Sequence, residues 1–267
     1  MEGWLEFRRV LFRSPMLVRA NVAIKKVESM GLSLAESSEI PMIEETSLQA
    51  VQSLELSQIN HSYKGSDGSF HLGTIDLKFT ANQLVFIVGG NGSGKSTLAK
   101  ILTGLYAAES GEVKLNGQSI TNENRDWYRQ HFAVVFVDFY LFEKLLGMNP
   151  ATVDIEANKY LELLQIAHKV QIKDGHLSTV DLSQGQRKRL ALLTAYLDDR
   201  PIYVFDEWAA DQDPVFRDVF YRELLPALQR RGKMIFAISH DDRYFHLADR
   251  VIKLDYGQVE ADYVPSN

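Results

Sequence analysis

The fold is decided by Gly89-Gly90-Asn91-Gly92-Ser93-Gly94-Lys95-Ser96, which has the spacing Gly-x4-Gly-Lys-Ser. The apolar run 84–88 has strand length and comes directly before this stretch, and residues with helical spacing follow it: Leu98, Ile101, Leu102 and Leu105. A strand, a glycine-rich turn and a helix in this order predict a loop whose main-chain N–H groups point inward at phosphate oxygens. The first turn of the helix adds the positive end of its dipole.

Each residue type in this loop has a predicted task. Lys95 can reach the β- and γ-phosphates of a bound nucleotide, and the hydroxyl of Ser96 can hold Mg²⁺. The sequence therefore predicts ATP and Mg²⁺ as ligands, with these residues as nucleotide contacts: Gly89, Asn91, Gly92, Ser93, Gly94, Lys95, Ser96 and Thr97. The alternative is a glycine-rich turn that binds nothing, which the flanking pattern disfavours.

Two acidic residues follow the wholly apolar run 202–205, which is typical of a buried parallel strand. Asp206 is expected beside the phosphate loop, where its carboxylate can help to hold Mg²⁺. Glu207 is then placed to polarise the attacking water as a general base. The alternative for this pair is an acidic strand end that faces solvent.

A histidine, His240, follows the next apolar run, 234–239. Its position at the end of the strand after the acidic pair allows it to contact the γ-phosphate and to respond to hydrolysis. A lone histidine is more often a structural or solvated residue, and that alternative stays open. The candidate catalytic residues are therefore Glu207 and His240.

The composition is that of an ordinary globular protein. The 267 residues are 45% hydrophobic, which is enough for a sizeable core, and the absence of cysteine excludes disulfides and thiolate metal sites. The net charge of −6 argues against a nucleic-acid partner, and the basic run Arg187-Lys188-Arg189 is expected to be a solvated helix face. No apolar run approaches the roughly 20 residues that a membrane-spanning helix needs.

Strand and helix patterns alternate along the chain, which predicts an α/β sheet with antiparallel pieces near its start. Strands are expected at 54–59, 74–80, 84–88, 132–137, 202–205 and 234–239, and helices at 154–168, 183–197 and 214–231. Hairpins are expected about Asn116-Gly117 and about Asp255-Tyr256-Gly257. A turn at 65–68 is expected to separate two strands.

The first residues differ in character from the rest. Leu5-Glu6-Phe7-Arg8-Arg9-Val10-Leu11-Phe12-Arg13-Ser14 matches what one frame of a common sequencing adapter encodes, so residues 1–14 are interpreted as a library artefact. A basic amphipathic arm or a poor targeting signal is the alternative. Residues 16–34 have helical spacing, and the polar stretch 37–47 predicts a linker.

The stretch Leu182-Ser183-Gln184-Gly185-Gln186 lies between the phosphate loop and the acidic pair, directly before a predicted helix. It resembles the signature sequence of ABC-transporter ATPases, with Gln184 where glycine is commoner. The resemblance covers roughly residues 54–263. It implies a P-loop NTPase (ABC ATPase) fold with a mixed sheet core, an antiparallel β subdomain and a helical signature subdomain. The expected ATP-binding domain is 53–267, preceded at 15–52 by a helical run-out and a linker.

Further site residues come from this resemblance. It implies that Tyr63 stacks on adenine, for which a strand tyrosine packed on the sheet is the alternative. It also implies that Ser183, Gly185 and Gln186 contact the ATP held by a second copy of the chain. Asp213 would belong to the loop that passes between the two copies, so a homodimer is expected.

One departure from the family pattern concerns the metal. The glutamine that usually follows the run 132–136 is replaced by Val137, which cannot coordinate a cation, and Asp138 comes next. Asp138 or a water is therefore expected to serve at Mg²⁺, unless coupling to the membrane domain differs.

Two longer stretches resemble the cyclic-peptide and siderophore-peptide exporters of this superfamily. They are 128–142 and 206–214, where Trp208 replaces the usual proline. In those exporters the ATPase follows six membrane helices in one polypeptide, and residues 20–28 resemble the run-out of the last helix. The resemblance implies the C-terminal part of a half-transporter, soluble as a fragment. The full-length protein would lie in the bacterial inner membrane, with this domain at the cytoplasmic face.

The implied function is the ATP-hydrolysing motor of an exporter that moves peptide or siderophore-like cargo outward across the inner membrane. The implied partners are ATP, a second copy of the domain and a membrane domain, without nucleic acid. A stand-alone soluble ABC ATPase, an importer ATP-binding subunit and a nonfunctional fragment are the alternatives.

Overall fold

The computed structural model describes residue 48 and the ranges 50–65, 68–145 and 150–265. The predicted adapter-derived segment at 1–14, the helix at 16–34 and the linker at 37–47 lie outside the described residues. Within those residues no helix is both long enough and apolar enough to cross a membrane.

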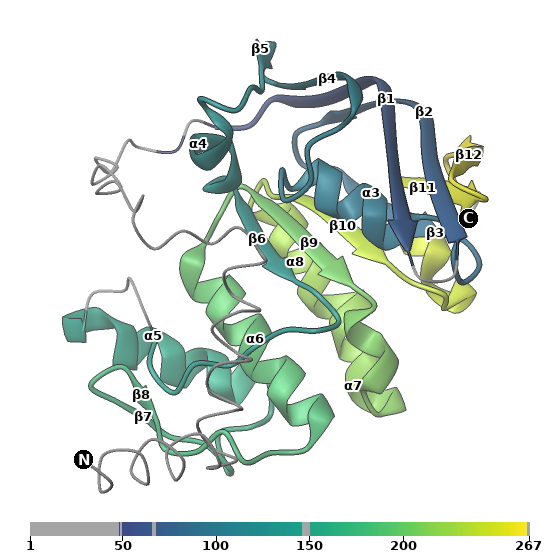
Figure 1. The fold of residues 1–267 in the computed structure, drawn as a ribbon. Coiled ribbons are helices and arrows are strands. Elements are labelled where there is room, and N and C mark those ends of the chain that lie inside the picture. Colours follow the sequence, from purple (N-terminus) through teal and green to yellow (C-terminus); the bar gives the residue numbers. More distant parts are fainter. Residues whose placement is uncertain (1–47, 49, 66–67, 146–149, 266–267) are drawn as a thin grey trace, which may run out of the picture. The chain divides into compact units, whose positions relative to one another are not determined.

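The central sheet carries the strands that the apolar runs predict (Figure 1). Its order is β12-β11-β3-β10-β9-β6, with bounds Gln258–Tyr263, Arg250–Asp255, Leu84–Val88, Met234–Ile238, Ile202–Asp206 and Phe132–Val135. The strands from β11 to β6 run parallel, and β12 pairs with β11 in the antiparallel sense about the predicted turn. All residues of β3, β9 and β10 are buried, as expected for parallel strands covered on both faces.

A second, antiparallel sheet has the order β2-β1-β4-β5. Its bounds are Gly68–Thr80, Ser53–Gly65, Ser110–Leu115 and Gln118–Ser119. The β4–β5 hairpin turns at Asn116-Gly117, where both residues have positive φ, as the sequence predicts. Strands β1 and β2 are longer than predicted, because their pairing continues from Ser53 opposite Thr80 to Gly65 opposite Gly68.

Helices follow the strands along the chain. They are α3 (Lys95–Leu102), α4 (Arg125–Arg129), α5 (Pro150–Leu163), α6 (Gln184–Asp198), α7 (Pro214–Val219) and α8 (Leu225–Arg230), with the short strands β7 (Ile172–Lys173) and β8 (His176–Leu177) after α5. The helix predicted at 154–168 therefore starts and ends earlier. Helix α5 packs mainly on α6. The helix predicted at 214–231 contains a π-helical turn, η3 (Phe220–Leu224), between α7 and α8. Pro226, which has no N–H to donate to the preceding turn, accounts for this break.

Two hydrophobic cores lie on opposite faces of the central sheet, because successive side chains of a strand point to opposite sides. Val85 and Ile87 of β3 pack with α3 and the antiparallel sheet. Leu84 and Phe86 of the same strand pack with the helices α5 to α8. The predicted mixed α/β sheet with an antiparallel β subdomain is confirmed.

Candidate nucleotide-binding and hydrolysis site

The phosphate loop joins β3 to α3 in a conformation that only glycine adopts easily. Gly89 has φ 144° and Gly94 has φ 103°. A Cβ at Gly89 would lie 2.2 Å from the carbonyl oxygen of Leu254, so the close packing excludes any larger residue. Lys95 is the first residue of α3, and its buried Nζ donates to the carbonyl oxygens of Gly89 (3.0 Å) and Gly90 (2.9 Å). The ammonium is thus held inside the curl of the loop.

The turn of the last hairpin supports this loop from outside. The N–H of Gly257, between β11 and β12, donates to the carbonyl oxygen of Ser93 at 3.0 Å. The carbonyl oxygen of Gly257 accepts from the N–H of Gly73 in β2 at 2.9 Å. The hydroxyl of Ser93 is buried and has no hydrogen-bond partner among the described residues. One residue therefore ties the loop to both sheets.

Asp206 ends β9 at the same edge of the sheet from which the phosphate loop leaves β3, because both strands run parallel to β10 between them. The hydroxyl of Ser96 donates to Oδ1 of Asp206 over a long 3.4 Å. Burial raises the pKa of Asp206, the charge of Glu207 adds to the rise, and the Ser96 hydrogen bond opposes it. Burial lowers the pKa of Lys95, while Glu207 and Asp206 act in the opposite direction. The predicted pair of metal ligands, Ser96 and Asp206, is brought together.

Glu207 and His240 lie side by side at the ends of neighbouring strands. Nε2 of His240 is 2.8 Å from Oε1 of Glu207. Glu207 has φ 49°, in the left-handed region, and its N–H donates to the carbonyl oxygen of Ile238 at 3.2 Å. The sequence predicted each residue separately and did not predict their contact. A carboxylate against an imidazole is an arrangement suited to proton transfer and to fixing the base.

A cavity of about 230 Å³ lies over the phosphate loop. Its lining residues are Phe70, Asn91, Gly92, Gly94, Lys95, Ser96, Thr97 and Glu207. Of these, only Phe70 was missed by sequence reasoning, because it reaches the loop from β2, far away in the chain. Phe70 is opposite Tyr63 in the register of β1 and β2, in a stretch of pairing that extends beyond the predicted strands. The side chain of Tyr63 lies outside the described residues.

Asp138 follows β6 and is exposed, as is Val137. Because β6 runs parallel to β9, this loop leaves the sheet at the edge where Asp206 lies. Among the described residues, no group of three His, Cys, Asp or Glu side chains is placed to hold a metal ion. The structure brings Ser96 to Asp206, and the role of Asp138 at Mg²⁺ stays a prediction.

The signature segment begins α6. Ser183 is the N-cap residue, and it forms a reciprocal capping box with Gln186, in which each side chain bonds the other's main-chain N–H. A Cβ at Gly185 would lie 2.8 Å from the carbonyl oxygen of Asp211, so glycine permits close contact with the loop after the acidic pair. Nε2 of Gln212 donates to the carbonyl oxygen of Gly185 at 3.1 Å. These residues do not line the cavity over their own phosphate loop.

The predicted solvated basic face is wrong for two of its three residues. Only Arg187 is exposed. Lys188 has a side chain 1% exposed, and its Nζ binds the carboxylate of Asp211 at 2.7 Å and the carbonyl oxygen of Glu207 at 3.0 Å. The two acceptors of this buried cation, on Asp211 and Glu207, come from a distant stretch of the chain, and helical spacing does not reveal such contacts.

Arg189, which is buried, forms an ion pair with the exposed Asp213. The guanidinium of Arg189 donates to Asp213 at 2.6 Å and lies 3.6 Å from the ring centroid of Phe216. Asp213 is also the N-cap of α7 and accepts from the N–H of Phe216 at 2.9 Å. The hydrogen bond from this N–H lowers the pKa of Asp213 most, and the charge of Arg189 lowers it further. Asp213 therefore has a structural task in its own chain.

Comparisons with known proteins identify a family for this chain. The sequence profile of the ABC transporter family matches residues 72–210. ATP-binding protein SyrD of Pseudomonas syringae pv. syringae is 45% identical over 262 residues, which cover 93% of this chain and 46% of SyrD. Subtilin transport ATP-binding protein SpaT of Bacillus subtilis is 29% identical over 228 residues, covering 79% of this chain and 37% of SpaT. The chain thus spans less than half the length of these relatives.

A solved structure has the same fold. It is a dimeric ATP-binding cassette in a post-hydrolysis state, bound to ADP and Pi, with a TM-score of 0.69 and 22% sequence identity. The match covers 80% of this chain and 99% of that one. Together with the profile match and the phosphate loop beside its acidic pair, this assigns the chain to the ABC transporter family, as an ATP-binding domain that hydrolyses ATP.

Proposed function

We propose that this domain is the motor of an ABC exporter and that Glu207 activates the attacking water. The single observation that carries the proposal is the 2.8 Å contact between His240 and Glu207 at the rim of the phosphate-loop cavity. His240 orients the carboxylate and reaches the γ-phosphate, and Lys95 neutralises the β- and γ-phosphates. Tyr63 stacks on the adenine. The loop glycines, with Asn91, Ser93 and Thr97, surround the phosphates.

Mg²⁺ fits the donors that the site offers. The Ser96 hydroxyl and the Asp206 carboxylate are hard oxygen ligands, which this cation prefers. When bound, the ion neutralises charge that develops on the phosphate oxygens. Asp138 acts in place of the usual glutamine, and its exposed position after β6 suits contact through a water.

Two copies of the domain enclose two ATP molecules. Ser183, Gly185 and Gln186 lie away from the cavity of their own chain, which supports a role at the nucleotide of a second copy. The dimeric state of the solved cassette with the same fold supports the same arrangement. Asp213 lies on the loop next to this surface, where Arg189 and the α7 cap hold it.

The remaining partner is a membrane domain at the cytoplasmic face of the inner membrane. Tyr140 and Phe142, on the loop after β6, are 75% and 59% exposed and contact each other edge to face. An exposed aromatic pair on a loop at the nucleotide edge of the sheet suits a protein contact. The subtilin transport named for SpaT supports a transport role, and we infer peptide or siderophore-like cargo for this protein.

Glu207→Gln tests the hydrolysis mechanism, because the amide keeps the shape of the side chain and removes its basicity. We expect ATP binding to persist, turnover to fall by about 10²- to 10⁴-fold, and ATP-dependent dimers to accumulate in sedimentation experiments. Glu162→Gln, on the exposed surface of α5, is the matched control and should behave as the parent. Undiminished turnover of the Glu207→Gln variant would refute the assignment.

The export proposal has its own test in the source DNA. We expect an open frame upstream of codon 15 that encodes membrane helices. A stop codon directly upstream, followed by a start codon for this domain, would contradict a fused exporter and favour a separate ATP-binding subunit. This result is independent of the role of Glu207.

A further inference from the structure

His240 is flanked by two residues that the structure fixes firmly. Asp241, which follows it, has a side chain 17% exposed and accepts two hydrogen bonds from Arg243, at 2.8 and 2.6 Å. Ser239, which precedes it, is buried, and its hydroxyl is 2.7 Å from the hydroxyl of Tyr221. The N–H of Asp241 donates to the same Ser239 hydroxyl at 3.0 Å. The main chain on both sides of His240 is therefore held in place.

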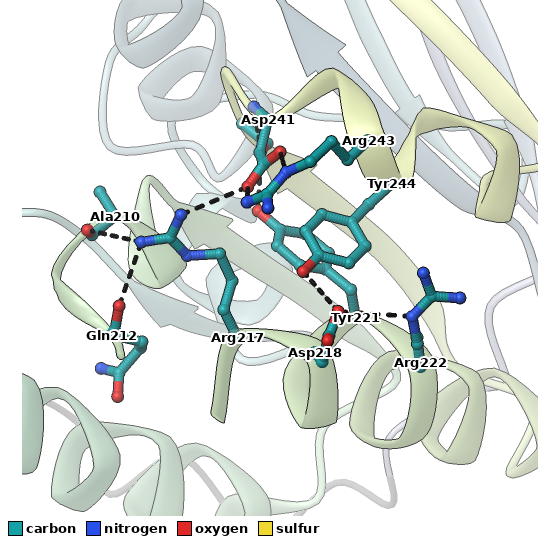
Figure 2. Close-up of polar contacts among 10 residues, drawn as sticks. Ala210, Gln212, Arg217, Asp218, Tyr221, Arg222, Asp241, Arg243 and Tyr244 are labelled. Atoms are coloured by element: carbon teal, nitrogen blue, oxygen red, sulfur yellow. Dashed lines mark hydrogen bonds and ion pairs between the residues drawn. The ribbon is translucent and has the colours of Figure 1, made fainter. Parts of the chain in front are cut away.

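Arg217, on α7, links this segment to the one that carries Glu207. Figure 2 shows its guanidinium between Asp241 on one side and the main chain of Ala210 and Gln212 on the other. Nη1 lies 3.4 Å from Oδ2 of Asp241, and Nη2 donates to the carbonyl oxygens of Gln212 (3.0 Å) and Ala210 (3.4 Å). Ala210 lies in the short helix η2 (Trp208–Asp211), of which Glu207 is the N-cap residue and Gln212 the C-cap residue.

The two linked segments also line a common cavity. The cavity has a volume of about 360 Å³, and Glu207, Ala210, Arg217, His240 and Asp241 are among its lining residues. Open space gives no steric resistance to a relative shift of the two segments. The bonds of Arg217 therefore supply a restraint that packing does not supply here.

We propose that Arg217 is a positioning residue that keeps His240 in contact with Glu207 during ATP hydrolysis. The inference rests on the proposed roles of those two residues. A planar guanidinium has several donors in a fixed fork, so it reaches the carboxylate and both carbonyls at once. The ammonium of a lysine places all its donors on one nitrogen, so it cannot reproduce this spaced pair of donor nitrogens.

The experiment compares turnover and ATP affinity in the 267-residue chain. Arg217→Ala is expected to lower kcat by about 10- to 100-fold, because small misplacements of catalytic groups have effects of this size, while the Kd for ATP stays unchanged. Arg217→Lys keeps the charge, and its kcat should be close to that of the alanine variant. Arg222→Ala is the matched control, since Arg222 is 54% exposed on the same helical run, pairs with exposed Asp218 and lies 5.7 Å from the ring centroid of Tyr244.

A double-mutant cycle separates positioning from a general structural effect. If Arg217 acts through His240, then Arg217→Ala should change kcat by less than about twofold in a His240→Ala background. An equal fall in kcat in both backgrounds would overturn the inference. So would a parental kcat for either Arg217→Lys or Arg217→Ala. Melting curves show whether each variant is folded. If Arg217→Ala fails to fold, the kcat of Arg217→Lys decides whether the inference holds.

The proposed function and this inference fail in different ways. Undiminished turnover of Glu207→Gln or His240→Ala contradicts the proposed chemistry. Loss of turnover in those two variants, combined with parental turnover of Arg217→Ala, contradicts only the inference about Arg217.

Discussion

The indole Nε1 of Trp208 donates a 2.9 Å hydrogen bond to the carbonyl oxygen of Lys188 in α6. The same ring stacks on Phe220, with centroids 4.3 Å apart, and is almost wholly buried. Trp208 directly follows Glu207 in the chain. The residue that stands where proline is usual therefore anchors the acidic pair to the helix of the signature segment.

Removal of this indole hydrogen bond should be measurable. Trp208→Phe keeps an aromatic ring against Phe220 and loses the N–H, so we expect the free energy of unfolding in urea to fall by about 1 kcal/mol. Trp208→Ala also leaves a cavity and should lower it by about 3–5 kcal/mol. Trp127→Phe, at a half-buried tryptophan away from the site, is the control. Equal stability of all three variants would contradict an anchoring role.

Lys188 and its neighbour Arg187 offer a matched pair of substitutions. Lys188→Met keeps the length of the side chain but leaves Asp211 and the Glu207 carbonyl without their cation. We expect a loss of about 2 kcal/mol in unfolding free energy, below the loss for a fully buried pair because Asp211 is 39% exposed. Arg187→Met, on the exposed side, should change stability little. Similar losses from both substitutions would show that burial of Lys188 is unimportant.

The charge of Asp241 gives a pH-dependent contribution to stability. Hydrogen bonds from Arg243, and then from Arg217, hold the pKa of Asp241 below its ordinary value, which is about 3.9. A lowered folded-state pKa stabilises the protein fully above the unfolded-state pKa, and this contribution is lost as the pH falls through the folded-state pKa. We therefore expect the stability difference between the parent and Asp241→Asn to be constant near neutral pH and to shrink below about pH 4. Urea unfolding at a series of pH values measures it, and a difference that grows with acidity would contradict the ion pairs.

Features that depend on neighbouring residues were predictable from the sequence. The strand, loop and helix at 84–102 follow from the glycine spacing and the apolar runs, and the hairpin at Asn116-Gly117 follows from its turn residues. The N-cap of α6 at Ser183 was placed within one residue, because the helical pattern starts there. Local backbone preferences decide each of these features.

Features that depend on distant contacts were not predictable. Helical spacing alone places Lys188 beside exposed Arg187, and only the approach of Asp211 and Glu207 explains why its ammonium is buried. Phe70 comes to the phosphate loop through the register of β1 and β2, which extends beyond the predicted strands. The bridge made by Arg217 likewise joins segments that separate stretches of the chain supply.

The support of the phosphate loop by Gly257 has a consequence for synthesis on the ribosome. The loop at 89–96 emerges early, yet the main-chain bonds from Gly257 to Ser93 and from Gly73 to Gly257 need a residue made more than 160 positions later. A nascent chain can therefore not complete its nucleotide pocket until residue 257 has left the exit tunnel. Any stabilisation of the emerging domain by bound ATP through the complete pocket therefore comes late in synthesis.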